Sequence, residues 1–195
     1  EVYKFVTHGG ISVSVGNGNI AHQSVDAIVN AANTKLQNGA GVTGAIFKHG
    51  GPEFEKECRK TMLQRKNHPL NVGEVVEVRA TGKLACKSVL HLAGPVWYRY
   101  SDKQYAFDVL KYGLESVLYK CQSHGFATLA LPPVATGIYG TPLNIFVHAM
   151  LKALSTFEQK YPPSRSALNY IRILSIDDHT VANLASLFSN AIGHQ

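Results

Sequence analysis

An apolar run that stops at two closely spaced amides constrains the fold of this chain more than any other segment. Residues 25–29 predict a buried strand, and the segment Asn30-Ala31-Ala32-Asn33 follows directly after it. A glycine-rich turn, Gly39-Ala40-Gly41-Val42, then leads into a second apolar stretch. Glycine lets the backbone approach a ligand closely, and N–H groups where a turn enters a helix attract anions. The segment therefore predicts a strand, a turn and a helix with an anion-binding surface between them.

A second glycine loop follows another apolar strand, with the sequence Leu131-Pro132-Pro133-Val134-Ala135-Thr136-Gly137-Ile138-Tyr139-Gly140. Its glycines should allow several backbone N–H groups to face an anion without the help of a lysine. Two strand-end glycine loops and a nearby amide together suggest a phosphorylated ligand that carries ribose. The alternative for either loop is an ordinary turn, a role that glycine commonly fills.

Strands and helices alternate along most of the chain. Apolar patterns predict strands at residues 2–6, 11–15, 25–30, 74–80, 88–93, 128–131 and 170–176, the first two as an edge hairpin. Helical spacing predicts helices at residues 42–49, from 52 onward, at 102–124 and at 141–160, and a last helix near the C-terminus. This alternation indicates an α/β fold, with a largely parallel sheet between helices. Ligands of such sheets lie beyond the carboxyl ends of the strands, so both glycine loops should reach one crevice.

Capping residues predict where the helices begin and end. Gly50-Gly51 should end the first helix, and Pro52 suits the first turn of the next. Asp102 should cap the long helix, and Thr141-Pro142 should supply a cap and a first turn. The last helix should start at Asp178 or Thr180.

Composition limits the class of protein. With 195 residues, 45% hydrophobic and 16% charged, the chain is expected to form one globular domain over residues 1–195. No apolar run is long enough to span a membrane, and the first residues lack a secretory signal pattern. Because the sequence starts at Glu1, we expect a domain taken from a larger protein.

The cysteines and histidines predict no metal site. Cys58, Cys86 and Cys121 are odd in number and have no C-x-x-C spacing, and the histidines show no ligand spacing. Buried free thiols in a reducing compartment are the expected state of the cysteines, which favours an intracellular protein of the nucleus or the cytoplasm.

The net charge of +6 favours anionic partners. The basic residues are dispersed, and the densest group is Arg59-Lys60 with Arg65-Lys66. We interpret that group as a solvated helix face, with a nucleic-acid patch as the alternative. No aromatic strand motif for nucleic-acid recognition accompanies it.

Together with Gly18-Asn19-Ile20 and the segment from His91 to Trp97, the two glycine loops resemble the macrodomain family. The resemblance runs from about Gly16 to the C-terminus, and the matching segments occur in the expected order. It implies a three-layer α/β/α fold around a mixed, mostly parallel sheet of about six to seven strands. It also implies ADP-ribose as the ligand, with no further cofactor. The layout is most similar to macrodomains of the mono-ADP-ribosyltransferases in the poly-ADP-ribose polymerase family.

The resemblance implies a role for each part of the site. Asn33 would bond the distal ribose, with the capping of its own turn as the alternative role. Tyr139 would form an apolar wall beside that ribose or belong to the core, and Thr136 would donate a hydroxyl to the diphosphate. The expected ligand-binding residues are Asn19, Ile20, Ala31, Asn33, Gly39, Ala40, Gly41, Val42, Val134, Ala135, Thr136, Gly137, Ile138, Tyr139, Gly140 and Ile176.

Several positions depart from the common pattern of the family. Asn19 replaces an aspartate that accepts from the adenine amino group, which removes charge assistance. Ile176 replaces an aromatic residue that stacks on adenine, at a cost of about 1–3 kcal/mol. Ala135 stands where many members have serine, and Ala40 replaces the middle glycine of three. We therefore expect real but weaker binding than in the tightest members.

Thr43 stands where some hydrolytic macrodomains have an aspartate beside the attacking water. Threonine is no general base near neutral pH, and loss of a positioned base costs about 10²–10⁴-fold in rate. Other hydrolytic members lack this aspartate and would use the phosphate of the substrate to orient water. In that case Asn33 would be the catalytic residue.

The leading hypothesis is a monomeric module that recognises free or protein-linked mono-ADP-ribose. The second is a hydrolase that removes mono-ADP-ribose from aspartyl or glutamyl esters. The third is a basic module for poly-ADP-ribose or nucleic acid.

Overall fold

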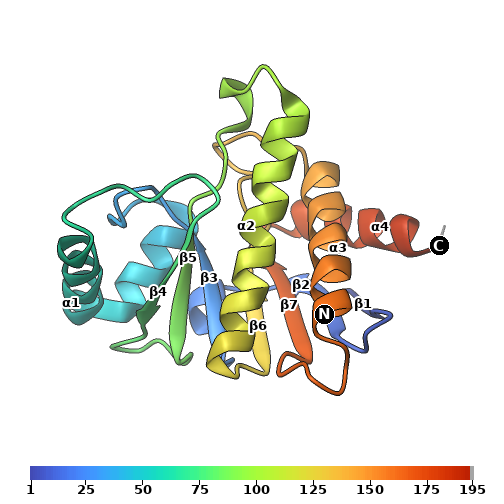
Figure 1. The fold of residues 1–195 in the computed structure, drawn as a ribbon, viewed down its shortest axis with the longest axis horizontal. Helices are drawn as coiled ribbons and strands as arrows, with labels where there is room; N and C mark the ends of the chain where they lie inside the picture. The colour runs from blue at the N-terminus through green and yellow to red at the C-terminus, as the bar shows by residue number, and fades with distance from the viewer. Residues whose placement is uncertain (194–195) are drawn as a thin grey trace.

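The computed structural model describes residues 1–193, and these contain one seven-stranded sheet in the order β1-β2-β7-β6-β3-β5-β4 (Figure 1). The strands are β1 (Tyr3–Val6), β2 (Ser12–Asn17), β3 (Ala27–Ala31), β4 (Val75–Arg79), β5 (Ser88–Leu92), β6 (Thr128–Leu131) and β7 (Tyr170–Ser175). All neighbours from β2 to β5 pair in parallel, and the two outermost pairs are antiparallel. The predicted mixed, mostly parallel sheet is confirmed.

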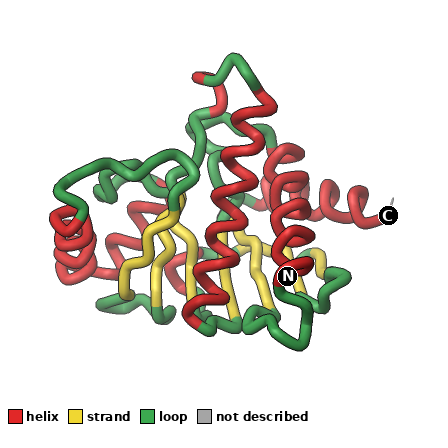
Figure 2. The backbone as a smooth tube through the Cα atoms, in the orientation of Figure 1, coloured by secondary structure: helices red, strands yellow, loops and turns green. Residues whose placement is uncertain are grey.

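Helices cover both faces of the sheet (Figure 2). They are α1 (Gly41–Gln64), α2 (Lys103–His124), α3 (Leu143–Lys160) and α4 (Asp178–Gly193), with short 3₁₀ turns η1 (Ile20–His22) and η2 (Trp97–Arg99). One apolar cluster joins α1 and η1 to the sheet, and the other joins α2, α3 and α4 to its opposite face. The three-layer α/β/α arrangement is thereby confirmed.

The central strands are apolar because both of their faces are buried. In β3, Ile28 lies in the α1 cluster, whereas its neighbour Val29 lies in the opposite cluster. In β5, Val89 likewise lies in the α1 cluster and Leu90 in the opposite one. Successive side chains of a strand point to opposite faces, so a strand between two helical layers has no exposed face for polar residues.

Most predicted helix ends agree with the structure. Asp102 caps α2, because its carboxylate accepts the Tyr105 N–H at 3.1 Å. The start of α4 at Asp178 was also predicted, although the capping side chain is Asp177, which accepts from both the N–H and the hydroxyl of Thr180. The prediction for Thr141 is wrong: its hydroxyl is buried without a hydrogen-bond partner in residues 1–193, and α3 begins after Pro142.

The predicted break at Gly50-Gly51 is a sharp kink within α1. Gly51 has φ 70° and ψ −171°, a conformation almost restricted to glycine, and Pro52 starts the second half. The loop before β5 satisfies the carbonyls that the kink frees. Lys83 N–H donates to His49 at 2.8 Å, and the Thr81 hydroxyl donates to Gly50 at 2.8 Å.

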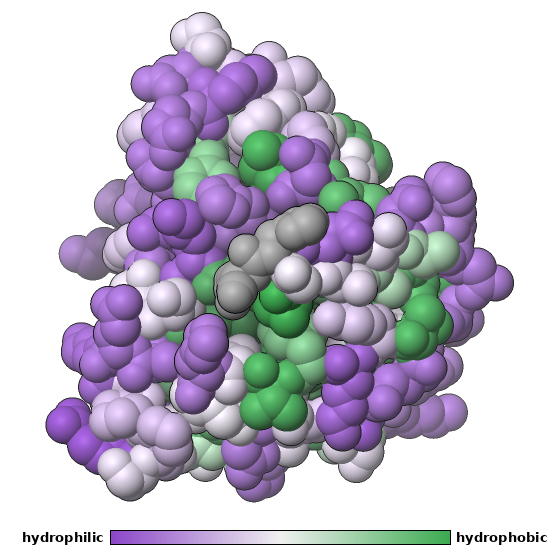
Figure 3. All heavy atoms as spheres, turned by 90° about the vertical axis from the view of Figure 1, so that its right-hand side faces the viewer, coloured by the Kyte–Doolittle hydropathy of each residue, from purple (hydrophilic) through white to green (hydrophobic). Residues whose placement is uncertain are grey.

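Within residues 1–193, no helix is long and apolar enough to cross a bilayer. On the face at the C-terminal end, hydrophobic side chains lie in small groups among hydrophilic ones (Figure 3). Cys58, Cys86 and Cys121 are buried and free, as predicted.

Candidate functional site

The chain leaves the sheet in opposite directions at the crevice between β3 and β6. From β3 it runs through α1 toward β4 and β5, whereas from β6 it runs through α3 toward β7. Ligands of open α/β sheets bind at such a switch point, beyond the carboxyl ends of the strands. That edge is uppermost in Figure 1. It is formed by the ends of β2, β7, β6, β3 and β5, in that order.

The structure brings the predicted loops together along this edge. The Asn33 loop (residues 32–40) follows β3, and the Thr136 loop (residues 132–141) follows the neighbouring strand β6. Asn19 and Ile20 follow β2, and Ile176 follows the adjacent β7. Backbone bonds tie the loops to one another: Gly18 N–H donates to Ser175 at 3.0 Å, and Trp97 N–H donates to Tyr139 at 2.8 Å.

Both central loops present backbone N–H groups without internal partners. Among residues 1–193, no side chain caps the start of α1, where Gly41 has φ 60°. In the Thr136 loop, the N–H groups of Gly137, Ile138 and Tyr139 donate to no acceptor in the described part of the chain. Unpaired N–H groups at a helix start and in a tight loop attract anions without any cationic side chain.

The Thr136 loop is anchored through a residue that sequence reasoning did not single out for this role. Ala135 has φ 66°, unusual for a residue other than glycine, and is 7% exposed. It packs on Gly94, where an added Cβ would lie 3.1 Å from the Ala135 Cβ. Backbone strain of this kind occurs often at functional sites. In the sequence, the segment from His91 to Trp97, which contains Gly94, indicated the family resemblance but not this contact.

Asn33 holds its own loop in this structure. Its Oδ1 accepts from the N–H groups of Lys35 (3.0 Å) and Gln37 (3.1 Å), and its Nδ2 donates to the Gln37 carbonyl at 2.7 Å. This is the turn-capping role given above as the alternative. One amide hydrogen remains for another acceptor, so contact with a ribose hydroxyl stays a prediction.

Thr136 and Asn19 also use part of their hydrogen-bonding capacity internally. The Thr136 hydroxyl donates to the Pro133 carbonyl at 2.7 Å, so it would have to rotate to donate to a phosphate. The Asn19 Oδ1 accepts the Ala21 N–H at 2.9 Å and thereby caps η1. A carbonyl oxygen has a second lone pair, and Asn19 can still accept a further bond.

Thr43 is the end of a buried polar chain. It is 8% exposed, and its hydroxyl donates to the Asn30 side chain at 3.0 Å and lies 3.3 Å from the Ala31 carbonyl. The Asn30 amide lies 3.1 Å from His91 Nδ1, and His91 Nε2 lies 3.8 Å from the Cys58 sulfur. These contacts join the first turn of α1 to its second half through two strands.

None of the four side chains in this buried hydrogen-bonded series is charged near neutral pH. Burial lowers the pKa of His91 to about 3, so its imidazole is neutral, and the Asn30 contact assigns Nδ1 as the acceptor. Burial, together with the nearby Glu55 and Glu57, raises the pKa of Cys58 to about 12. The position next to the glycine turn therefore offers structural support and no general base.

Two exposed apolar side chains flank the loops. Ile138 is 86% exposed and Ile176 is 77% exposed. Tyr139 is half-buried and packs against the core beside α3, which was one of its two predicted roles. Isolated apolar side chains at a crevice suit contact with a flat or ribose-bearing ligand.

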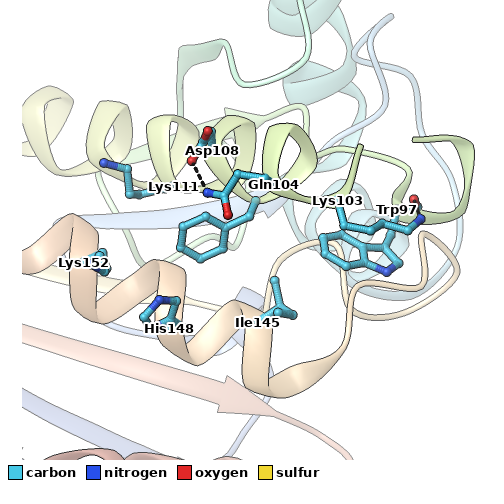
Figure 4. Close-up of a pocket in the computed structure, with 9 residues that line it drawn as sticks. Trp97, Lys103, Gln104, Asp108, Lys111, Ile145, His148 and Lys152 are labelled. Atoms are coloured by element: carbon cyan, nitrogen blue, oxygen red, sulfur yellow. Dashed lines mark hydrogen bonds between the residues drawn. The ribbon is translucent and has the colours of Figure 1, made fainter. Parts of the chain in front are cut away.

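Two hollows lie beside the loop edge. The Thr136 loop lines neither of them, and residues 35–38 of the Asn33 loop line one. The α2–α3 groove, of about 520 Å³, is bounded by residues from Trp97 to Lys152 (Figure 4). The second hollow, of about 550 Å³, lies between residues 35–38 and α1. We place the main ligand on the loop edge instead, because the unpaired N–H groups are there. Among residues 1–193, no three His, Cys, Asp or Glu side chains are grouped to hold a metal ion.

The two arginines of the basic group near the C-terminal end of α1 form ion pairs. Arg59 lies 3.1 Å from Glu55, and both side chains are mostly exposed. Arg65 binds both carboxylate oxygens of Glu74, at 2.8 and 2.9 Å. These contacts favour the solvated-face interpretation over a nucleic-acid patch.

Comparison with protein families gives a match to the Macro domain over residues 29–150. An uncharacterised Thermotoga maritima protein is 35% identical over 97% of this chain, which spans 30% of that relative. An O-acetyl-ADP-ribose deacetylase of Salmonella gallinarum is 35% identical over 76% of this chain and 80% of its own length. Mouse protein mono-ADP-ribosyltransferase PARP9 is 28% identical over 99% of this chain and 22% of its own length.

Solved structures with the same fold include two macrodomains. One from Oceanobacillus iheyensis, with ADP, has a TM-score of 0.87 at 22% identity over 98% of this chain and 97% of its own. One from Trypanosoma brucei, in complex with ADP-ribose, has a TM-score of 0.76 at 26% identity over 94% of this chain and 69% of its own.

Proposed function

This chain belongs to the macrodomain family, and from that premise we propose that it binds ADP-ribose along the carboxyl edge of its sheet. The proposed role is a module that recognises mono-ADP-ribose, free or attached to a protein. The Trypanosoma brucei complex with ADP-ribose and the named substrate of the Salmonella relative support this ligand class. The match to PARP9 favours ADP-ribosylated proteins as partners.

The observation that carries the proposal is the set of unpaired N–H groups at the switch point. The start of α1 and the Thr136 loop follow adjacent strands, and within residues 1–193 each has backbone N–H groups without an internal acceptor. A diphosphate between them would accept from both loops. Neighbouring strands lie about 4.8 Å apart, so three strand steps separate the ends of β2 and β3 by about 14 Å. That span suits a diphosphate with one ribose on each side, with adenine near Asn19 and Ile176.

The second candidate function is hydrolysis of an ADP-ribosyl ester, which the similarity to a deacetylase favours. The buried state of Thr43 argues against efficient hydrolysis. Its hydroxyl already donates to Asn30, and no ionisable group takes the place of an aspartate there. Without a positioned base, the rate would fall by about 10²–10⁴-fold. We therefore place recognition before removal of the modification.

Calorimetric titration with ADP-ribose tests the proposal, with adenosine as the control. We expect saturable binding in a ratio of about one to one and much weaker binding of adenosine, which lacks the diphosphate and the distal ribose. Bound ligand should also raise the melting temperature, because it stabilises only the folded state. The proposal fails if ADP-ribose at millimolar concentration gives neither heat nor a shift in melting temperature.

A further inference from the structure

The α2–α3 groove has an apolar floor and a basic rim. The apolar part of its lining includes Phe107, which is 9% exposed, and the half-buried Ile145. Lys103 stands at one end, beside Trp97, and Lys111 and Lys152 stand at the other (Figure 4). Lys103 and Lys111 are eight residues apart on one helix, about 12 Å at about 1.5 Å per residue. An extended peptide of about four residues has this length.

The groove begins where the proposed ADP-ribose cleft ends. Trp97 lines the groove, and its N–H donates to the Tyr139 carbonyl in the Thr136 loop at 2.8 Å. Ile145 lies in the first turn of α3, which directly follows the same loop. A polypeptide attached to a ribose beside Tyr139 would therefore leave the proposed cleft next to the groove.

The groove lining has three lysines against one carboxylate. Asp108 accepts from Gln104 at 3.0 Å, which occupies part of that carboxylate. Lys111 lies 3.2 Å from the mostly buried Glu115, an ion pair by distance without hydrogen-bond geometry. Lys152 is exposed and has no carboxylate within 4.0 Å in residues 1–193. The groove therefore retains a positive rim that an acidic segment would complement.

The aromatic rings in the groove favour a peptide over a nucleic acid. Lys103 Nζ lies 5.1 Å from the centre of the Trp97 ring and also donates to the Trp97 carbonyl at 2.7 Å. The Phe107 ring packs against His148 with centres 5.1 Å apart. Recognition of single strands depends on open ring faces on which bases stack. Each of these two rings already has one partner within the protein, which leaves less ring surface for a base.

We propose that the α2–α3 groove binds an acidic polypeptide segment next to the ADP-ribosylated residue of a partner protein. This inference rests on the proposed function, because it extends the same site from the modification to the chain that carries it. Lys103, Lys111 and Lys152 pair with carboxylates of the segment, and Phe107 and Ile145 contact an apolar side chain between them.

The test measures the affinity of three ligands for the intact domain in low salt. They are free ADP-ribose, a peptide with one ADP-ribosyl group and flanking glutamates, and the same modified peptide with flanking serines. We expect the acidic peptide to bind about fivefold more tightly than the other two, and the gain to shrink as salt screens the charges. Equal affinity for the two peptides would overturn the proposal.

Substitutions then show which residues cause the gain in affinity for the acidic peptide. Lys111→Gln combined with Lys152→Glu should abolish this gain and leave the affinity for free ADP-ribose unchanged. Arg59→Glu, beside the second hollow, is the matched charge reversal and should retain it. Loss of the gain only with Arg59→Glu would place the peptide in the other hollow and refute the proposal. Tighter binding of poly-ADP-ribose or single-stranded RNA than of the acidic peptide, lost in the double variant, would also refute it. Failure of free ADP-ribose to bind the unaltered protein is a separate result, and it would overturn the proposed function as well.

Discussion

At the scale of single residues, the loops differ in what an added side chain would meet. A Cβ at Gly137 would have no heavy atom within 4 Å, so the fold does not require glycine there. At Gly94 the same atom would meet Ala135 at 3.1 Å. Gly137 can therefore be changed to test the ligand, whereas a change at Gly94 would mix the effects of folding and binding.

Gly137→Glu should leave the protein folded and weaken ADP-ribose binding by about 100-fold or more. The carboxylate would stand beside the N–H groups proposed to face the diphosphate, and repulsion adds to the loss of close backbone approach. Calorimetry measures the affinity, and circular dichroism checks the fold. Gly137→Ala is the control and should bind within a few-fold of the unaltered protein. A folded Gly137→Glu variant with normal affinity would show that the loop does not face the diphosphate.

His91 should make the stability of the fold depend on pH. Burial lowers its pKa to about 3 in the folded protein from an ordinary value of 6.5, so between these two pH values the unfolded chain binds a proton that the folded chain does not. Stability due to neutral His91 is therefore present above pH 6.5 and is lost as the pH falls. Between pH 7.5 and pH 4.5 the loss from this residue should be about 2–3 kcal/mol.

Urea unfolding at the two pH values, compared with His91→Gln, measures this contribution. The glutamine amide can accept from Asn30 and donate toward Cys58 but does not titrate. On acidification, the free energy of unfolding of the variant should fall by about 2–3 kcal/mol less than that of the unaltered protein. An equal loss in both proteins would exclude His91 as its source.

At the scale of elements, the sequence predicted what local rules determine. Asp102, the Gly50-Gly51 break and the apolar spacing of α2 each act within a few residues of chain, and the structure agrees with them. The prediction for Thr141 is wrong because the folded loop buries this residue and bonds its N–H to the Ala135 carbonyl, and within residues 1–193 its side chain does not cap α3. The Asn30–His91 contact was not predicted, since it depends on β3 and β5 lying side by side.

The candidate site was predictable to a similar extent. The order of the motifs placed both glycine loops at strand ends, and the topology brings those ends to one edge. The internal bonds of Asn33 and Thr136 and the positive φ of Ala135 depend on the exact path of each loop. No spacing rule in a single sequence reports that path.

Gly51→Ala tests the kink of α1. With φ 70° and ψ −171°, the backbone there strains any residue with a Cβ, although no heavy atom lies within 4 Å of the added group. We expect a loss of about 1–3 kcal/mol in the free energy of unfolding. Denaturant unfolding measures it, and Gly137→Ala, also in open space but without a positive φ, should cost much less. Equal stability of the two variants would mean that the kink relaxes without strain.

At the scale of the whole molecule, the sheet supplies the site and the helices hold it in place. Five strand ends share one edge, and each loop is anchored in a separate strand. Such a platform can bind an extended ligand without catalysing any reaction of it. Whether a reaction follows depends on a group near the proposed position of the distal ribose, and the neighbouring residues there are Thr43 and Asn33.

Incubation with a protein that carries ADP-ribose on glutamate should leave the label in place over the period in which a hydrolase would remove it. The reason is that Thr43 is held by Asn30 and cannot act as a base. Any slow loss should disappear in Asn33→Ala and persist in Asn38→Ala, an asparagine of the same loop that bonds only Gly39 among the described residues. Rapid loss with many turnovers would identify an enzyme. Slow loss that survives Asn33→Ala would place the chemistry elsewhere in the cleft.

The parallel order of β2, β7, β6 and β3 fixes the length of the proposed site along this edge. Adjacent hydrogen-bonded strands lie about 4.8 Å apart, and no surface substitution can lengthen or shorten that spacing. Side chains such as Asn19 and Ile176 can change how firmly each end is held, while the length that is measured stays fixed. An analogue of ADP-ribose with one phosphate more or fewer between its two riboses would then be too long or too short to reach both ends. We expect such ligands to be rejected by length even where every chemical group has a suitable partner.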